Sequence, residues 1–277
     1  MTTAADWSGR VGESWAAELA RTDRSFADLS PHLDAAIRAA APDGPGSAVD
    51  LGCGAGQTSI TFATARPDLT VTGVDLSPDL VRAAAARGAA LPNLRFTVAD
   101  LATEPEVVAS GADILFSRHG VMFFADPATV FARLHAAVAP GTPLVFSCFR
   151  SAAENPWAGD LIAHITGKAP QPLAGYAPGP FGFADPDWVK TMLAAAGWRA
   201  AAAQPVDYRY VAGEGDDPIA DAVAFFRRIG PVASAIGAAP EPDRLAMIDR
   251  LATALGLHRD GATVGFPAAA WIWTTRA

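Results

Sequence analysis

The segment Ala48-Val49-Asp50-Leu51-Gly52-Cys53-Gly54-Ala55-Gly56-Gln57-Thr58 decides the fold of this chain. An apolar run that leads into three alternating glycines predicts a short buried strand, a tight loop and the start of a helix. Glycine has no Cβ, so backbone in such a loop approaches a ligand closely. The free N–H groups at the start of the helix favour an anionic group. The segment therefore predicts a site for a nucleotide-like cofactor.

Strand and helix patterns alternate on both sides of this segment. The apolar runs predict strands at 48–51, 70–75, 94–99, 112–117 and 143–149. The helical patterns between them cover 57–66, 78–88, 104–110 and 127–139. Apolar strands separated by helices indicate a parallel sheet covered on both faces, which binds ligands at the carboxyl ends of its strands.

The remaining parts of the chain predict additions to this core. Apolar residues at steps of four predict helices within 6–41, namely Trp7, Val11, Trp15 and Leu19, then Leu29, Leu33 and Ile37. Proline, glycine and aromatic residues make 151–184 irregular. A helix over 185–197, a strand near 203–211, helices over 217–229 and 241–256, and a last strand over 268–275 complete the expected elements.

We interpret the chain as one domain over 1–277. Its parts are an N-terminal helical cap (6–41), a cofactor-binding core (47–150), a lid or substrate insert (151–184) and a helical insert (217–256). A length of 277 residues, 51% of them apolar, suffices for such a core.

Acidic residues narrow the choice of cofactor. In dinucleotide-binding loops the third glycine falls one residue later, at the position that Gln57 occupies here, so a pyrophosphate is not favoured. Asp75 ends the second strand and suits the two hydroxyls of a ribose. Asp100 follows the third strand and suits an adenine amino group. Asp50, just before the glycines, suits a cationic or amino group.

Together these residues resemble those of class I S-adenosylmethionine-dependent methyltransferases. The likeness runs through 49–58, 73–77, 99–101, 112–117 and 140–146. The phrases at 117–127, 154–157 and 267–271 resemble a bacterial small-molecule branch, loosely related to the ubiquinone and menaquinone C-methyltransferases. The resemblance implies an α/β, Rossmann-like, seven-stranded sheet with the order 3-2-1-4-5-7-6 and an antiparallel strand 7. It also implies S-adenosyl-L-methionine as the cofactor.

The resemblance further implies which residues contact this cofactor. Arg10 and Trp15 would fold over its methionine part, the glycines would line its methionine and ribose end, and Ser117 would contribute from the fourth strand. The full expected set is Arg10, Trp15, Asp50, Gly52, Cys53, Gly54, Gly56, Thr58, Asp75, Leu76, Asp100, Leu101 and Ser117.

The acceptor side is expected after the fourth and fifth strands. His119 is the candidate general base, since histidine titrates near neutral pH; the alternative is a packing or hydrogen-bonding role in its loop. Arg118 is a candidate for steering an anionic substrate, or else pairs with an acid such as Asp126. The aromatic set Trp157, Tyr176, Phe181 and Phe183 predicts a lid over an apolar pocket, or a packed cluster. The expected pocket residues are Arg118, His119, Met122, Trp157, Tyr176 and Phe181.

These patterns predict methyl transfer to an O, C or N nucleophile of a small, fairly apolar metabolite. Other readings are a cyclase or decarboxylase on the same fold, an NAD-dependent oxidoreductase, and a non-enzymatic partner protein. The formal net charge of −8 disfavours nucleic acid as a partner. The two cysteines lack zinc-site spacing, so no metal is expected. Neither a leader segment nor a membrane span is expected, which suggests the cytoplasm, with the chain as a monomer or homodimer.

Overall fold

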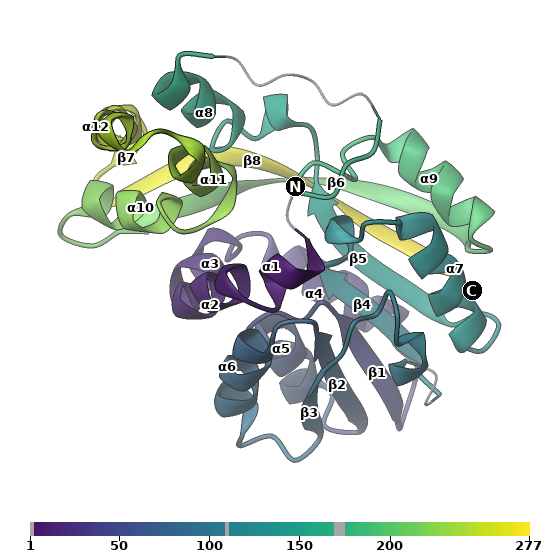
Figure 1. Cartoon of the computed structure of the whole chain (residues 1–277). Helices are drawn as coiled ribbons and strands as arrows, with labels where there is room; N and C mark the ends of the chain where they lie inside the picture. Colours follow the sequence, from purple (N-terminus) through teal and green to yellow (C-terminus); the bar gives the residue numbers. More distant parts are fainter. Residues whose placement is uncertain (1–2, 109–110, 169–174) are drawn as a thin grey trace.

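A central sheet organises the molecule (Figure 1). The computed structural model describes residues 3–108, 111–168 and 175–277. The strand order is β3-β2-β1-β4-β5-β8-β6, and a short β7 pairs with β8. The five neighbouring strands β3, β2, β1, β4 and β5 are parallel, whereas β8 is antiparallel to both β5 and β6. The sixth strand expected from the sequence is β6, and the expected seventh strand is β8. With this correspondence the expected order 3-2-1-4-5-7-6 is confirmed, and the short β7 is an addition.

The strands are β1 (Gly46–Leu51), β2 (Leu69–Asp75), β3 (Leu94–Val98), β4 (Ile114–Arg118), β5 (Pro143–Phe149), β6 (Arg199–Glu214), β7 (Arg259–Asp260) and β8 (Thr263–Arg276). Both β6 and β8 are longer than the sequence predicts. Pairing of β8 with β5 ends at Phe149 opposite Ala270, but pairing with β6 continues to Glu214 opposite Thr263. The outer halves of β6 and β8 therefore project beyond the sheet as an arm, and β7 pairs with β8 at its end.

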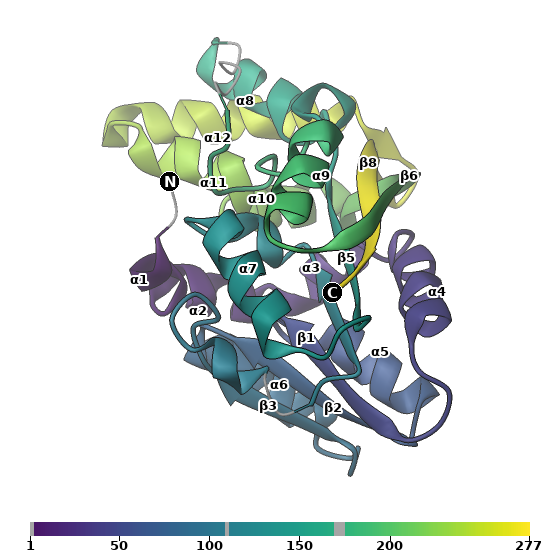
Figure 2. The same cartoon turned by 90° about the vertical axis from the view of Figure 1, so that its right-hand side faces the viewer.

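The helices are α1 (Ala4–Trp7), α2 (Arg10–Ala17), α3 (Leu19–Ser25), α4 (Ser30–Ala40), α5 (Gln57–Ala65), α6 (Pro78–Gly88), α7 (Pro127–Ala137), α8 (Gly159–Thr166), α9 (Pro186–Ala195), α10 (Pro218–Phe226), α11 (Gly230–Ala238) and α12 (Glu241–Gly256). Single 3-10 turns are η1 (Pro105–Val107), η2 (Val121–Phe123) and η3 (Ala152–Glu154). Helices α4 and α5 cover one face of the sheet, and α7 and α9 cover the other (Figure 2).

The structure corrects the helical predictions in three places. The expected helix through Trp7 and Trp15 is three short helices, with breaks at Ser8–Gly9 and Glu18. The expected helix at 104–110 is only the turn η1, and residues 109–110 lie outside the described part. Helices α8 and α11 were not expected, because the proline and glycine residues near their ends are typical of loops.

The N-terminal helices lie between the sheet and the helices on the arm. The Asp221 carboxylate of α10 forms ion pairs with two arginines of α3. The nitrogen–oxygen distances are 2.7 Å to Arg21 and 2.8 Å to Arg24. Gly12 of α2 lies so close to α6 that a Cβ there would be 2.0 Å from the Ser77 Oγ atom. These contacts hold α1–α3 over the carboxyl ends of the strands, between α6 and α10 (Figure 1).

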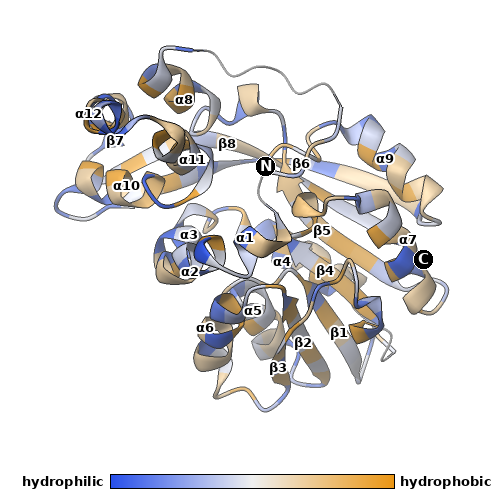
Figure 3. Cartoon of the chain, in the orientation of Figure 1, coloured by the Kyte–Doolittle hydropathy of each residue, from blue (hydrophilic) through white to orange (hydrophobic). Residues whose placement is uncertain are grey.

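The hydrophobic core follows the sheet. Hydrophobic colouring concentrates on strands such as β1 and β5 (Figure 3), and every residue of β5 is buried. Burial on both faces is the physical reason for continuous apolar strands in a parallel sheet. No helix in the described part is long and apolar enough to cross a bilayer. Within those same residues, no three His, Cys, Asp or Glu side chains gather as a metal site. The domain limits expected from the sequence stay predictions.

Candidate active site

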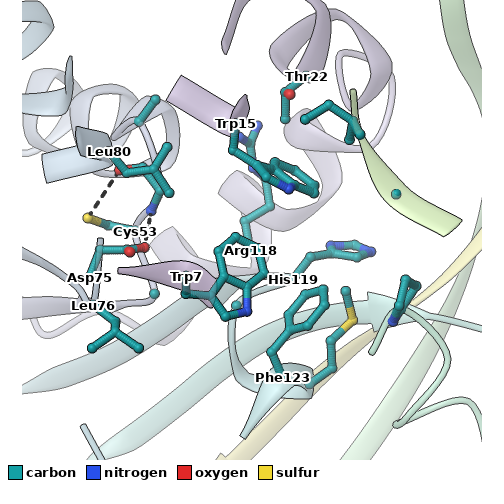
Figure 4. Close-up of a pocket in the computed structure, with 18 of the residues that line it drawn as sticks. Trp7, Trp15, Thr22, Cys53, Asp75, Leu76, Leu80, Arg118, His119 and Phe123 are labelled. Atoms are coloured by element: carbon teal, nitrogen blue, oxygen red, sulfur yellow. Dashed lines mark hydrogen bonds between the residues drawn. The ribbon is translucent and has the colours of Figure 1, made fainter. Parts of the chain in front are cut away.

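A cavity of about 270 Å³ lies at the carboxyl ends of β1–β5, beneath the N-terminal helices. Its wall combines residues at or just past the carboxyl ends of these strands, such as Gly52, Asp100 and His119, with Trp7 and Trp15 from the helices above. Figure 4 shows Cys53, Asp75, Leu76 and Leu80 on one side and His119 and Phe123 on the other, with Trp7, Trp15 and Arg118 between them. The cavity therefore joins two chemically different regions.

The glycine loop forms part of the first region. Gly52, Gly54 and Gly56 have left-handed φ values of 66°, 55° and 81°. A Cβ on Gly54 would meet nothing within 4 Å, so this glycine leaves open space for a ligand. A Cβ on Gly56 would lie 2.8 Å from the Phe96 ring and 2.9 Å from Ala84. Gly54 therefore opens the cavity, whereas Gly56 lets α5 start close to the sheet.

Two carboxylates face the same region. Asp75 accepts from the backbone N–H of Gly54 at 2.8 Å and of Ser77 at 2.9 Å. Burial raises the pKa of Asp75, and these backbone N–H groups partly offset that rise. Asp100 also lines the cavity and accepts from the Ala102 N–H at 2.9 Å. Both retain lone pairs for ligand hydroxyl or amino groups.

Asp50 lies beneath the glycine loop and outside the cavity wall. It is 1% exposed, and its Oδ2 atom accepts from the Ser59 hydroxyl at 2.6 Å. Its Oδ1 atom has no partner among the described residues. Burial raises the pKa of Asp50 to about 7, although the Ser59 hydroxyl and Arg118 oppose the rise. These contacts place Asp50 where it supports the loop from below.

His119 lies at the start of the second region with an unusual backbone. Its φ is 59°, a left-handed value that is uncommon for a residue other than glycine. The next residue, Gly120, is pressed against β1, since a Cβ there would be 2.7 Å from the Leu51 oxygen. The His119 ring lies 4.8 Å from Phe26 and 4.3 Å from Phe149, measured between ring centroids. Burial lowers the pKa of His119 well below its ordinary value, so the ring is neutral at pH 7.

Arg118 is held by protein groups. It donates to the Gln57 side-chain oxygen at 2.9 Å and to the Asp23 carboxylate at 3.1 Å. Asp23 also pairs with Arg87 at 2.6 Å, so one carboxylate serves two guanidinium groups. The partner of Arg118 is thus Asp23, in place of the Asp126 pairing considered from the sequence.

Aromatic side chains form the wall of the second region. Trp157 stacks on Tyr210, with centroids 4.8 Å apart and planes 6° apart. Tyr176 instead stacks on Trp188 at 4.9 Å and donates its hydroxyl to the Phe124 oxygen, outside the cavity wall. The ring of Phe181 packs against Trp157, with the ring centroids 6.1 Å apart. Of these three aromatic residues, only Trp157 lines the cavity; Phe181 packs against Trp157, and Tyr176 lies elsewhere, against Trp188.

The structure divides the expected site residues into two groups. Those that line the cavity are Trp15, Gly52, Cys53, Gly54, Asp75, Leu76, Asp100, Leu101, Arg118, His119, Met122 and Trp157. Those outside its wall are Arg10, Asp50, Gly56, Thr58, Ser117, Tyr176 and Phe181. Ser117 donates its hydroxyl to the Leu51 oxygen at 2.6 Å and is fully buried. Contact of either group with a cofactor stays a prediction.

Sequence reasoning missed several wall residues, among them Trp7, Thr22, Phe26 and Tyr210. Trp7 had a signal, because it shares the step-of-four pattern with Trp15. Phe26 and Tyr210 had none, since their contact with His119 and Trp157 depends on the docking of α3 and on the projecting arm. Phe225 and Phe226 of α10 are buried and also line the cavity.

Comparison with known proteins agrees with this geometry. A family model described as a methyltransferase domain matches residues 48–141. Trans-aconitate 2-methyltransferase of Methylobacterium radiotolerans is 32% identical over 48% of this chain and 56% of that protein. The enzyme of the same name from Azoarcus is 31% identical over 54% of this chain and 62% of that protein. The alignments thus span roughly half of these two relatives.

Solved structures share the fold. A proposed methyltransferase of Bacillus halodurans has a TM-score of 0.56 at 15% identity, covering 88% of this chain and 97% of its own. The YcgJ protein of Bacillus subtilis has a TM-score of 0.54 at 16% identity, with the same two coverages. The glycine loop, the strand-end carboxylates and the matching domain lead to one conclusion. Residues 48–141 of this chain match a methyltransferase domain, in agreement with the expected resemblance to class I S-adenosylmethionine-dependent methyltransferases.

Proposed function

We propose that this protein transfers the methyl group of S-adenosylmethionine to an O, C or N nucleophile on a small, predominantly apolar molecule. The observation that carries the proposal is the joined cavity: its glycine loop and carboxylates lead directly into an aromatic chamber. A cofactor and an acceptor held in one cavity meet without crossing bulk water.

The first region fits this cofactor. The open space at Gly54 suits its methionine and ribose end. Asp75 suits the ribose hydroxyls, while Asp100 and Leu101 suit the adenine. When bound, the cofactor supplies an electrophilic methyl group on a positively charged sulfur. Trp7 and Trp15 lie over the same region and would exclude water from it.

The work of the protein is then mainly positioning. Holding a nucleophile in line with the methyl group contributes roughly 7–11 kcal/mol through effective concentration. Phe149, Trp157 and Tyr210 provide a rigid apolar wall for this purpose. The general-base role expected for His119 from the sequence is disfavoured, because burial lowers its pKa well below the ordinary value and makes it a weak base at neutral pH.

The charges of the wall bear on the kind of acceptor. The curated relatives are named for trans-aconitate, a tricarboxylate. Among the described wall residues, Arg118 is the single Lys or Arg, and it is already engaged by Asp23 and Gln57. Asp23, Asp75 and Asp100 face the cavity as acids. A tricarboxylate would lose its hydration without gaining cations, so we infer an acceptor that is largely uncharged.

The test is a competition for a labelled methyl group. The purified protein is incubated with methyl-labelled S-adenosylmethionine and three acceptor groups: planar phenols, planar ketones and trans-aconitate. We expect labelled product from an aromatic acceptor and none from trans-aconitate. Preferred methylation of trans-aconitate would overturn the substrate class. A product that forms without label would instead support the cyclase or decarboxylase reading. As part of the same proposal, the protein acts in the cytoplasm as a monomer or homodimer.

A further inference from the structure

Ser147 and His119 form a buried polar pair beside the aromatic wall. The Ser147 Oγ atom lies 2.8 Å from the Nδ1 atom of His119. Ser147 is fully buried and His119 is 6% exposed. A second contact fixes the geometry, because the backbone N–H of His119 donates to the Ser147 carbonyl at 3.1 Å. The imidazole is therefore held at its backbone and at Nδ1 by the same residue of β5.

Counting donors and acceptors decides which atom of this pair carries the proton. Within the described part of the chain, the Ser147 hydroxyl has no other hydrogen-bond partner. If Nδ1 carried the proton, both the Ser147 hydrogen and the Nε2 lone pair would be buried without partners. If Ser147 donates to Nδ1, only the Nε2–H group lacks one. Unsatisfied buried polar groups are costly, so the arrangement with one is favoured.

The Nε2 atom is the unsatisfied end. It is buried and has no partner among the described residues. The Thr22 hydroxyl and the Trp7 indole N–H share this property, and all three residues line the cavity. Buried polar groups in folded proteins are nearly always satisfied, by protein, water or ligand. An oxygen of a ligand held beside His119 would supply the acceptor that the Nε2–H group lacks.

The backbone agrees with a role for the His119 ring. A residue with φ of 59° is strained, and such strain persists where the surrounding structure holds a side chain in place. Here the Ser147 carbonyl and the close approach of Gly120 to Leu51 and Gly52 hold it. The strained residue lies at the junction of the cofactor region and the aromatic wall.

We propose that Ser147 fixes His119 as a neutral imidazole protonated on Nε2, and that this Nε2–H group binds an oxygen of the acceptor molecule. This inference rests on the proposed function and narrows its substrate class to apolar molecules with a carbonyl, enol, phenol or ether oxygen. His119 then holds the acceptor as a donor, where the sequence suggested a base. Ser147 is a positioning residue that acts through His119.

The tautomer is tested without cofactor or turnover. Long-range ¹H–¹⁵N spectra of histidine-labelled protein at neutral pH distinguish protonated from unprotonated ring nitrogens, and His119→Gln assigns the His119 signals. We expect a protonated Nε2 and an unprotonated Nδ1. Ser147→Ala should move the Nδ1 signal, while Ser234→Ala on exposed α11 should leave it unchanged. A His119 ring protonated on Nδ1 alone, or on both nitrogens, would overturn the proposal.

The hydrogen bond to ligand is tested with two probes of one shape, in the presence of S-adenosylhomocysteine. 1-Indanone carries a ketone oxygen, and indane is the same frame without it. We expect His119→Met to weaken the binding of indanone by about fivefold or more, because the donor is lost. His119→Gln should bind indanone more tightly than His119→Met does, because its amide N–H can donate. The affinity for indane should change little in either variant. Equal losses for the two probes, or no binding of either, would contradict the inference. Calorimetry with S-adenosylhomocysteine alone tests the proposed cofactor separately.

Discussion

Asp75 ties the glycine loop to the end of β2, because one carboxylate oxygen accepts the Gly54 N–H at 2.8 Å. The other oxygen accepts the Ser77 N–H at 2.9 Å, at the start of α6. The residue expected to bind ribose therefore also sets the shape of the loop that faces the cofactor. Loss of its carboxylate removes a ligand contact and a structural contact together.

We predict that Asp75→Ala weakens binding of S-adenosylhomocysteine by about tenfold or more, since a hydrogen bond to a charged group contributes roughly 1.5–3 kcal/mol. Isothermal titration calorimetry measures the change. Asp68→Ala is the matched control, because Asp68 pairs with Arg66 at the opposite end of β2. Unchanged affinity in Asp75→Ala would show that the ribose contact is misplaced.

The glycines Gly54 and Gly56 should respond differently to alanine. Both have positive φ, which costs about 1–2 kcal/mol for a residue with a Cβ. At Gly56 the new methyl group would also collide with Phe96 and Ala84, so unfolding by urea should show the larger loss of stability. At Gly54 the methyl group enters open cavity space, so cofactor affinity should fall more than stability does. The opposite pattern would reverse the roles assigned to them.

Asp50 should make the stability of the free protein depend on pH. Its pKa is about 7 in the folded chain, above the ordinary 3.8, so the folded state binds the proton more tightly. The stabilising contribution is therefore complete at low pH and is lost as the pH rises from about 4 to about 7. The loss is about 1.4 kcal/mol per pH unit within that window.

Asp50→Asn mimics the protonated side chain and retains an acceptor for Ser59. We expect the unfolding free energy of this variant to fall less between about pH 5 and pH 7 than that of the wild type. Urea titrations across that range give both slopes. Two parallel slopes would mean that Asp50 titrates normally in the folded chain.

Cys53 lies in the glycine loop and lines the cavity, yet we predict that it is unreactive. Burial raises its pKa well above 9.0, and nearby Asp75 and Asp50 raise it further. Thiolate, the reactive form, is then scarce at neutral pH. A colorimetric disulfide reagent should modify neither Cys53 nor the buried Cys148 in the folded protein and both after unfolding. Rapid modification of Cys53 in the folded state would contradict this.

Most of the cofactor half was predictable because its signals are local. A strand, three glycines and a helix start are contiguous at 48–58, and Asp75 and Asp100 are recognisable because each lies at the carboxyl end of a strand. Parallel strands place their carboxyl ends at one edge, so these separate positions converge without further information. The order of the sheet was implied by the family resemblance, and the structure confirms it.

The acceptor half was decided by tertiary contacts. The sequence marked His119 and Trp157, but not that Ser147 would hold one ring or that Tyr210 would stack on the other. These contacts depend on the register of β4, β5 and β6 and on how far β6 and β8 project. The sequence by itself thus determined the fold class and the expected cofactor, because short-range patterns encode them. Only the tertiary structure decided the second, aromatic region of the cavity, because its wall comes from segments that packing brings together.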